Sequence, residues 1–337
     1  MSEQASAERT NSHPLAGKIM SGADIVVQVL ADEGVDTIFG YSGGAILPTY
    51  DAVFRYNKLH GGEGGRSPMP LIVPANEQGA GFMASGYARA SGKVGVVMVT
   101  SGPGATNTVT PVRDCMADSV PVVVICGQVP RSAVGTDAFQ EAPVSAIMGA
   151  VAKHVFLVTD PERLEATIRS AFELARTGRP GPVVIDIPKD VQNWEGAFMG
   201  SGALPLTGYR RRLQAVTENR LTDESCERFF EMLAESERPL IYAGGGVINA
   251  NAAKSMRRLA SEYGIPVTTT LMALGASDTR HPLALHMLGM HGIASANYAV
   301  EDCDFLMAVG ARFDDRVAGD PARFAPNAKR IAHFDVD

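Results

Sequence analysis

The sequence predicts an α/β protein with two doubly wound domains, each built on a parallel sheet. Short apolar runs alternate with helical stretches along most of its 337 residues. These runs lack the period-two alternation of strands with one solvated face, so they fit strands that helices cover on both sides. Turns rich in glycine, from a total of 35 Gly and 20 Pro, join the strands to the helices. Together these observations favour a layered α/β architecture.

Composition and charge exclude several functional classes. Apolar residues make up 45% of the chain and charged residues 20%, which is typical of a globular protein. The formal net charge of -7 argues against binding to nucleic acid or to a membrane surface. No run reaches the roughly 18 uninterrupted apolar residues of a membrane-spanning helix. We therefore expect a protein that acts on small molecules.

The spacing of the cysteines and the first residues of the chain indicate the cellular compartment. Residues 1–19 are expected to be a frayed tail, since they begin with a polar stretch that has no apolar core. Glu3 and Glu8 argue against a secretory signal or an organelle transit peptide. Four cysteines lie far apart without CxxC spacing, and we expect mostly buried thiols in a reducing cytoplasm: Cys115, Cys126, Cys226 and Cys303.

Residues 20–190 are predicted to form the first domain. Ser21 can cap a helix that carries Ile25, Val26 and Leu30 on its apolar face and that ends at Gly34. The strands predicted after it cover residues 37–39, 71–74, 94–100, 122–126 and 183–187. The main helices predicted between them cover residues 77–91 and 162–177.

Residues 191–216 show no clear periodicity and are predicted to be a linker between domains. The second domain, residues 217–337, resumes the alternation. It is predicted to contain a helix over 223–235, a helix ending at 263, and strands over 240–243, 267–270, 305–309 and 330–334. Because the chain stops directly after the last strand, we expect this domain to be incomplete.

Two glycine turns are the first candidates for a ligand site. The segment 38–53 (IFGYSGGAILPTYDAV) and the segment 100–107 (TSGPGATN) each follow a predicted strand and lead into a helix. Glycine lets backbone approach a ligand closely, and a helix start offers free N–H groups. Turns at the carboxyl ends of parallel strands open on one crevice, where ligands of such sheets bind. Taken singly, each is equally well explained as a tight structural turn.

Between these turns, Glu77 begins a helix that is rich in small residues, among them Gly79, Ala80, Gly81 and Ala84. The small residues allow the helix to pack closely and leave Glu77 in an apolar setting. An acid in a first helical turn is more often explained by favourable interaction with the helix dipole. The neighbouring motifs favour a chemical role instead.

Seven segments, in order, resemble the acetohydroxyacid synthase (acetolactate synthase) family, catalytic subunit: YSGGA, PANEQGAGFMASGYAR, TSGPGATN, DSVPVVVICGQVP, GTDAFQE, KH and GRPGPVVIDIPKDVQ. The resemblance covers essentially residues 20–337. It implies a pyrimidine-binding domain for thiamine diphosphate followed by a Rossmann-like central FAD-binding domain, with thiamine diphosphate, FAD and Mg²⁺ as cofactors. In one departure, Ser42 stands where the family usually has Pro, which frees φ and restores an N–H.

By this resemblance Glu77 would hydrogen-bond the aminopyrimidine ring of thiamine diphosphate and favour the imino tautomer, whose nitrogen accepts the thiazolium proton. Pyruvate would then lose carbon dioxide, and the two-carbon unit would pass to pyruvate or 2-ketobutyrate. The resemblance gives six further thiamine diphosphate contacts: Tyr41, Gly43, Gly44, Pro103, Asn107 and Ser119. For Ser119, a serine at a helix end is an adequate alternative.

Three residues are implied to meet the substrate. Phe139 and Gln140 would line the active site, with Gln140 donating to a carboxylate or carbonyl oxygen. Lys153 would supply positive charge for the pyruvate carboxylate, the alternative being a solvated surface lysine. His154 is expected to satisfy a local hydrogen bond. The resemblance also places Pro130 and Arg131 near an access channel.

The second domain resembles the family's flavin-binding domain, in which FAD is mainly structural. Arg312 and Arg316 can pair with the diphosphate bidentately; the less favoured alternative is that the FDDR run is an exposed ion-pair cluster. The implied FAD contacts are Arg179, Gly245, Gly246, Thr270, Leu271, Met290, His291, Gly310, Arg312, Asp314, Arg316 and Asp335.

The family holds the diphosphate and Mg²⁺ on a third domain, through a Gly-Asp-Gly motif and an Asn-Asn pair. Neither string occurs in this chain, so we expect that domain to be absent here and the metal ligands to lie in it. We expect a homodimer or larger homo-oligomer with the active site at the subunit interface, and a small regulatory subunit is an open possibility. The alternatives are a non-catalytic FAD-binding or dimerisation remnant and a sister 2-ketoacid decarboxylase.

Overall fold

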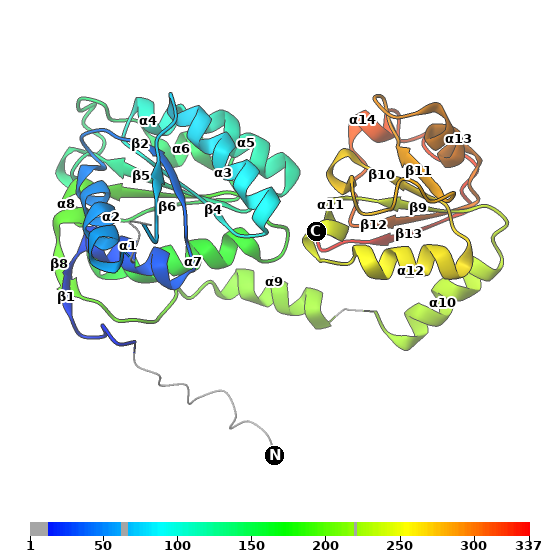
Figure 1. Ribbon diagram of the computed structural model, residues 1–337, viewed down its shortest axis with the longest axis horizontal. Helices are drawn as coiled ribbons and strands as arrows, with labels where there is room; N and C mark the ends of the chain where they lie inside the picture. Colours follow the sequence, from blue (N-terminus) through cyan, green and yellow to red (C-terminus); the bar gives the residue numbers. More distant parts are fainter. Residues whose placement is uncertain (1–12, 62–66, 219–220) are drawn as a thin grey trace, which may run out of the picture. The chain divides into compact units, whose positions relative to one another are not determined.

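The computed structural model describes residues 13–61, 67–218 and 221–337, and these divide into two compact units (Figure 1). The first unit runs to Tyr209 and the second begins at Arg210. Each unit has its own sheet and its own apolar core. The boundaries predicted from sequence, at residues 190 and 217, stay predictions.

The first unit is built on a six-stranded parallel sheet in the order β3-β2-β4-β5-β7-β6. Its strands are β2 (Ile38–Tyr41), β3 (Leu71–Ile72), β4 (Gly95–Val99), β5 (Val122–Gln128), β6 (His154–Leu157) and β7 (Val183–Pro188). Each neighbouring pair is hydrogen-bonded in parallel. The short apolar runs predicted as strands covered on both faces are therefore confirmed.

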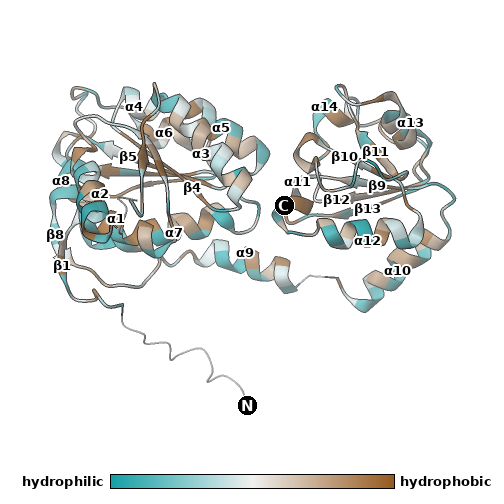
Figure 2. Ribbon diagram, viewed as in Figure 1, coloured by the Kyte–Doolittle hydropathy of each residue, from teal (hydrophilic) through white to brown (hydrophobic). Residues whose placement is uncertain are grey.

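Helices cover both faces of this sheet. They are α1 (Gly22–Asp32), α2 (Leu47–His60), α3 (Glu77–Ser91), α4 (Pro103–Thr106), α5 (Val109–Asp118), α6 (Val144–Gly149), α7 (Leu164–Arg176) and α8 (Lys189–Asn193), with short 3-10 turns η1 (Arg131–Ala133) and η2 (Pro161–Arg163). Successive side chains of β4 enter opposite cores. Val96 and Met98 pack with α1, α2 and α7, while Val97 and Val99 pack with α3 and α5. This alternation is the signature of a doubly wound sheet, and Figure 2 shows the apolar strands between helices with hydrophilic outer faces.

The expected tail (residues 1–19) and the expected linker (residues 191–216) are joined by a short antiparallel strand pair, which we call the clasp. Residues 1–12 of the expected tail lie outside the described residues, but β1 (Ile19–Ser21) pairs antiparallel with β8 (Glu195–Ala197). The reason is burial: Phe198 is fully buried and contacts the ring of His13. The expected linker, residues 191–216, thus contains the end of α8, all of β8 and most of α9 (Thr207–Glu218).

The second unit has a five-stranded parallel sheet in the order β11-β10-β9-β12-β13. Its strands are β9 (Pro239–Ala243), β10 (Val267–Thr269), β11 (Ala284–Met287), β12 (Phe305–Val309) and β13 (Arg330–Phe334). Its helices are α10 (Asp223–Ala234), α11 (Gly245–Asn249), α12 (Ala253–Tyr263), α13 (Ala294–Asp302) and α14 (Asp315–Ala318), with the 3-10 turn η3 (Leu271–Ala273). The predicted α/β class with parallel sheets is confirmed for both units.

The cysteines and the helices agree with the expectations from composition. All four cysteines are free; three are buried, and Cys226 is partly exposed. Burial raises the pKa of the Cys115 and Cys303 thiols to about 11, so both stay protonated at neutral pH. Among the described residues, no helix combines the length and the apolar character that a membrane crossing requires.

Candidate active site

The first candidate site lies where the strand order of the first unit reverses. The connection after β2 leads to β3 on one side, whereas the connection after β4 leads to β5 on the other. A crevice forms outside the carboxyl ends of two such strands, and it is the usual ligand position in open α/β sheets. The two glycine turns predicted from sequence follow these two strands, β2 and β4.

The two turns are in contact. A Cβ built on Gly43 would lie 2.5 Å from Cγ2 of Thr100, so only glycine fits there. The backbone N–H of Ala45 donates to Oγ1 of Thr100 at 3.2 Å. Thr100 therefore fixes the first turn against the second and leaves no room for a side chain at position 43.

Glu77 lies at this junction. It begins α3, whose N-cap Asn76 accepts a hydrogen bond from the N–H of Gly79. The Glu77 side chain is buried, with 8% of the residue exposed. Nδ2 of Asn107 donates to its Oε2 at 2.8 Å, and a Cβ built on Gly104 would lie 3.6 Å from its Oε1. The carboxylate therefore faces the crevice between the glycine turns rather than bulk water.

Three residues that support the first turn were not identified from sequence. Gln192 is fully buried; its Nε2 donates to the carbonyl of Ala45 at 2.8 Å, and its Oε1 accepts from Thr49 at 2.8 Å. The hydroxyl of Tyr50 donates to the carbonyl of Met98 at 2.9 Å. Burial, with a smaller contribution from the charge of Glu77, raises the pKa of Tyr50, so it remains a neutral donor. Gln192 lies far along the chain from the turn, and no local pattern reveals that contact.

These residues fit the pyrimidine end of thiamine pyrophosphate. A protonated ring nitrogen needs a buried carboxylate acceptor, and Glu77 provides one with Oε1 toward Gly104. Asn107 fixes the other oxygen, so the carboxylate has one orientation. The glycines at 43, 102 and 104 keep side chains out of the space beside it. Pro103 begins α4 next to this space, and Tyr41, Gly43 and Gly44 form or follow the end of β2.

The predicted substrate loop meets the same crevice. It follows β5, and a Cβ built on Gly102 would lie 2.4 Å from the carbonyl oxygen of Gln140, so the loop touches the β4 turn through backbone. Gln140 has a φ of 58°, in the left-handed region. The side chain of Phe139 is largely exposed, at 88%. Glu77, Asn107, Phe139 and Gln140 therefore belong to one edge of the sheet.

Ser119 and Lys153 lie at the opposite edge. Ser119 caps the end of α5 before β5, and Lys153 precedes β6, so both are at the amino ends of parallel strands. Nζ of Lys153 donates to the carbonyls of Leu174, Thr177 and Arg179 at 2.5, 2.8 and 2.7 Å. Nζ of Lys153 is thus engaged by carbonyl oxygens of its own unit, and its predicted contact with the substrate stays a prediction.

Arg179 lies beside Ser119 at this edge. Its Nε donates to Oγ of Ser119 at 3.0 Å, and its Nη2 donates to the carbonyl of Met116 at 3.1 Å. His154 also lies here, and burial lowers its pKa, so the neutral imidazole is favoured at neutral pH. Within the first unit, Ser119 therefore contacts the predicted flavin residue Arg179 rather than Glu77.

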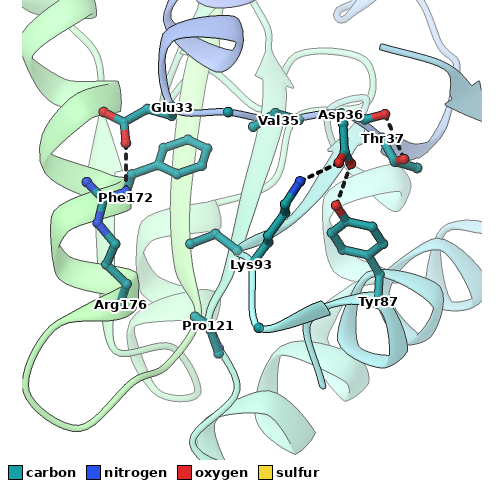
Figure 3. Close-up of a pocket in the computed structure, with 12 residues that line it drawn as sticks. Glu33, Val35, Asp36, Thr37, Tyr87, Lys93, Pro121, Phe172 and Arg176 are labelled. Atoms are coloured by element: carbon teal, nitrogen blue, oxygen red, sulfur yellow. Dashed lines mark hydrogen bonds and ion pairs between the residues drawn. The ribbon is translucent and has the colours of Figure 1, made fainter. Parts of the chain in front are cut away.

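A pocket of about 360 Å³ also opens on the amino edge (Figure 3). Its charged groups already pair with each other: Lys93 with Asp36 at 2.5 Å, and Arg176 with Glu33 at 2.8 Å. Lys93 holds the pKa of the Asp36 carboxyl below its usual range, with a further contribution from the hydroxyl of Tyr87. Because it opens at the other ends of the strands, this pocket is separate from the crevice that holds Glu77.

The second candidate site lies at the corresponding reversal in the second unit. The connection after β9 leads to β10, and that after β12 leads to β13 on the other side. The two turns pack backbone against backbone: the N–H of Gly246 donates to the carbonyl of Gly310 at 2.9 Å. A Cβ built on Gly244 would lie 2.1 Å from that same oxygen. Gly310, with φ +57°, is in a conformation that favours glycine.

The residues around this reversal fit a flavin nucleotide. Oγ1 of Thr270 is buried and has no hydrogen-bond partner among the described residues, which calls for a partner in the site. Leu271 and Met290 are exposed, at 66% and 67%, and offer apolar surface beside it. Arg316 lies next to Met290, with Nη1 3.7 Å from Sδ of Met290.

The charged residues of FDDR do form exposed ion pairs, as the alternative interpretation expects. Arg312 pairs with Asp314 at 3.3 Å, and Arg316 pairs with Asp315 at 3.9 Å. The Asp314 side chain also caps α14 by accepting from the N–H of Arg316 at 3.0 Å. Both guanidinium groups are half or more exposed, so the same geometry leaves them accessible to a diphosphate.

Two further residues predicted to contact the flavin, Asp335 and His291, are exposed to solvent. Asp335 follows the end of β13, and its Oδ1 accepts from the backbone N–H of Val336 at 2.7 Å. His291 is exposed in the loop after β11. No group of three or more metal-binding side chains occurs in the part of the chain that the structure describes.

Comparisons with known proteins identify both units. The family described as "Thiamine pyrophosphate enzyme, N-terminal TPP binding domain" matches residues 20–147. "Thiamine pyrophosphate enzyme, central domain" matches residues 226–337.

Three relatives illustrate the similarity. The chain is 44% identical over 328 residues to the acetolactate synthase catalytic subunit, mitochondrial, of Saccharomyces cerevisiae, with 94% of the chain and 46% of that protein covered. It is 45% identical to the acetolactate synthase isozyme 2 large subunit of Escherichia coli, covering 94% of the chain and 54% of that protein. It is 45% identical to the chloroplastic acetolactate synthase of Arabidopsis thaliana, covering 94% and 45%. The chain thus spans about half the length of the curated relatives it matches.

Proposed function

Because the chain belongs to the thiamine pyrophosphate enzymes and carries their N-terminal and central domains, we propose that it is the amino-terminal part of an acetolactate synthase catalytic subunit. The reaction is decarboxylation of pyruvate and transfer of the two-carbon unit to pyruvate or 2-ketobutyrate, which begins the synthesis of branched-chain amino acids. The observation that supports this most directly is the buried Glu77 carboxylate, oriented by Asn107 between two glycine turns.

Thiamine pyrophosphate, when bound, supplies the carbon nucleophile for the 2-ketoacid. Glu77 accepts the hydrogen bond of the pyrimidine ring nitrogen and holds a proton there, which a buried carboxylate does more strongly than a solvated one. Asn107 keeps Oε2 engaged, so Oε1 is the oxygen available to the ring. The glycine turns let the backbone close around the ring and exclude water.

Phe139 and Gln140 are the proposed substrate contacts of this chain. Both lie on the loop that touches the β4 turn through Gly102, and Gln140 offers donors to a carboxylate or carbonyl oxygen. For Lys153, its three carbonyl partners support a structural role instead.

We propose that FAD binds the second unit, in the crevice between the β9 and β12 turns, where Thr270 and Gly310 lie. Mg²⁺ and the diphosphate of the coenzyme are proposed to be held by protein outside this chain, since the relatives are about twice as long. A homodimer with shared active sites is the proposed assembly. A regulatory subunit and a cytoplasmic location stay predictions, and the relatives include mitochondrial and chloroplastic proteins.

The relatives described above are named acetolactate synthases, which favours the synthase over the sister decarboxylases and over a non-catalytic remnant. The deciding experiment is Glu77→Gln in the enzyme that contains this chain, assayed for acetolactate and for exchange of the thiazolium proton. Removing the acid-base group should lower both rates by about 10² to 10⁴-fold.

Glu224→Gln is the matched control, because Glu224 is also an acid in the first turn of a helix but is exposed. It removes a helix-dipole interaction and nothing else, so both rates should stay at the wild-type level. If the Glu77→Gln and Glu224→Gln proteins behaved alike, Glu77 would not be the activating group.

A further inference from the structure

The segment 135–141 curls around the side chain of Glu141. Oε1 of Glu141 accepts a hydrogen bond from the N–H of Gly135, and Oε2 accepts from the N–H of Ala138 at 3.1 Å. The backbone of Glu141 closes the same turn, since its N–H donates to the carbonyl of Ala138 at 2.9 Å. One carboxylate therefore binds two N–H groups of the same short loop, and Phe139 and Gln140 form the turn between Ala138 and Glu141.

This loop holds unusual backbone conformations. Asp137 and Gln140 have φ of 60° and 58°, and Gly135 has φ +84°. Non-glycine residues in the left-handed region cost free energy, and they persist only where the surroundings over-determine them. The carboxylate of Glu141 provides such a constraint, because its two oxygens accept from N–H groups that this conformation turns inward.

The charge of Glu141 matters for this role. Its pKa is lowered, chiefly by the N–H of Gly135, because hydrogen bonds to the carboxylate favour the ionised form. Arg131, the cation on the turn that precedes this loop, is engaged elsewhere. Arg131 of η1 pairs with Asp190 of α8 at 2.7 Å and donates to the carbonyl of Thr159. Glu141 is therefore anionic at neutral pH and binds its own backbone.

The carboxyl end of this loop is held against the strands β4 and β5 by two contacts. Gly102 of the β4 turn approaches the carbonyl of Gln140, two residues before Gly104, which faces Glu77. Just after the loop, Nε2 of buried Gln128 donates to the carbonyl of Ala142 at 3.2 Å. A change in the curl of the loop therefore moves Gln140 relative to the crevice.

We propose that Glu141 is a positioning residue, whose carboxylate folds the 135–141 loop and thereby sets Phe139 and Gln140 at the rim of the Glu77 crevice. The positioning of substrate rests on the proposed function, whereas the folding of the loop does not. The two parts are measured separately.

The first experiment follows the loop amides of the 337-residue chain by NMR and hydrogen exchange. In the wild type, the amide shifts of Gly135 and Ala138 should titrate together at a pH below the usual range of a glutamate. In Glu141→Gln the titration should vanish, and exchange at these two amides should speed up by at least about tenfold, since one acceptor oxygen becomes a donor group. Glu141→Ala should speed it further.

Glu162→Gln, an exposed glutamate in the same unit, is the control and should leave both amides unchanged. Thermal unfolding monitored by circular dichroism shows whether each variant is folded. Unchanged exchange and a retained titration in Glu141→Gln would overturn the proposal, whatever the activity of the enzyme.

The second experiment measures pyruvate turnover in the enzyme that contains this chain. Glu141→Gln should lower kcat/KM for pyruvate by up to about 10²-fold through misplacement of Gln140, with thiazolium proton exchange unchanged, because Glu77 is untouched. Loosened amides with unaltered kcat/KM would overturn the positioning claim. An inactive wild type would instead count against the proposed function, and the loop measurements would still decide the rest.

Discussion

Glu77 and Asp186 are both buried carboxylic acids in the first unit, but their surroundings differ. Glu77 accepts a hydrogen bond from Asn107 and borders a crevice. Asp186 lies within β7 and accepts from Nε2 of Gln128 at 2.9 Å, while its Oδ1 has no partner among the described residues. Burial raises the pKa of Asp186 to about 7, partly offset by Gln128. The first acid thus borders the candidate site, whereas the second is enclosed within the sheet.

Asp186 makes the stability of the first unit depend on pH. Its pKa is about 7 when folded and 3.8 in the reference state, so between these values the folded state binds more protons than the unfolded state. Stability should therefore fall as pH rises from about 4 to about 7, by about 4 kcal/mol in total. Asp186→Asn keeps the shape and the acceptor for Gln128 but does not titrate.

Urea unfolding measures this difference. The stability of Asp186→Asn relative to wild type should improve by about 4 kcal/mol from pH 4 to pH 8. Asp223→Asn, an exposed aspartate in the second unit, serves as the control and should show little such trend. A constant difference between wild type and Asp186→Asn across this range would contradict the assignment.

Substitution of Thr270 should have opposite effects on the stability of the apo protein and on its affinity for FAD. Its hydroxyl is buried without a partner, and Val has the same shape without the polar atom. Thr270→Val should stabilise the apo chain by about 1 kcal/mol and weaken FAD binding about tenfold, because it removes a hydrogen-bonding group from the proposed site.

Thermal unfolding measures the change in stability, and titration calorimetry with FAD measures the change in affinity. Thr217→Val, outside the proposed site on α9, is the control and should change FAD affinity little. Tighter FAD binding by Thr270→Val would show that the hydroxyl does not face the flavin.

At the scale of elements, the sequence predicted α3, the inner strand β12 and the edge strand β13, but it missed the edge strands β6 and β11. The bounds of α3, β12 and β13 match the prediction, since their apolar patterns and capping residues are local signals. The edge strands β6 and β11 are only four residues long, and His154 begins the first while His286 interrupts the second, so neither gave a clear strand signal. The β1–β8 pair joins residues far apart in sequence, and no local pattern encodes such a pairing.

Lys153 shows how one side chain can hold three elements together. It precedes β6, caps the carboxyl end of α7 through Leu174 and Thr177, and lies 5.3 Å from the ring centroid of Tyr209 at the start of α9. Lys153→Met should therefore lower the free energy of unfolding by about 2–4 kcal/mol, since three carbonyls lose a charged donor. Lys153→Arg should not restore it, because a planar guanidinium cannot match this arrangement.

Urea denaturation of the chain tests this, with Lys254→Met, an exposed lysine on α12, as the control for lost charge. If Lys153 contacted only solvent or substrate, both variants would be equally stable.

At the scale of the whole molecule, each unit places its candidate site at the reversal of its strand order. The sequence identified the two glycine turns of the first unit, because a glycine turn between a strand and a helix is a local pattern, and the family resemblance pointed to Gly245, Gly246 and Gly310 in the second. It did not identify the residues that hold these turns in place, such as Gln192, which donates a hydrogen bond to the carbonyl of Ala45. It also grouped Lys153 and Ser119 with Glu77, since the edge at which a residue lies depends on its position relative to the strands of the folded sheet.

The clasp of β1 with β8 has a practical consequence for the first unit. Ile19 lies opposite Ala197 in this antiparallel pair, so the beginning and the end of the sheet-bearing segment are neighbours. A short hairpin could join them, and new termini could then be opened at a surface turn elsewhere. The clasp thus makes this half of the chain suitable for circular permutation, with the order of its strands along the polypeptide changed and their order in space preserved.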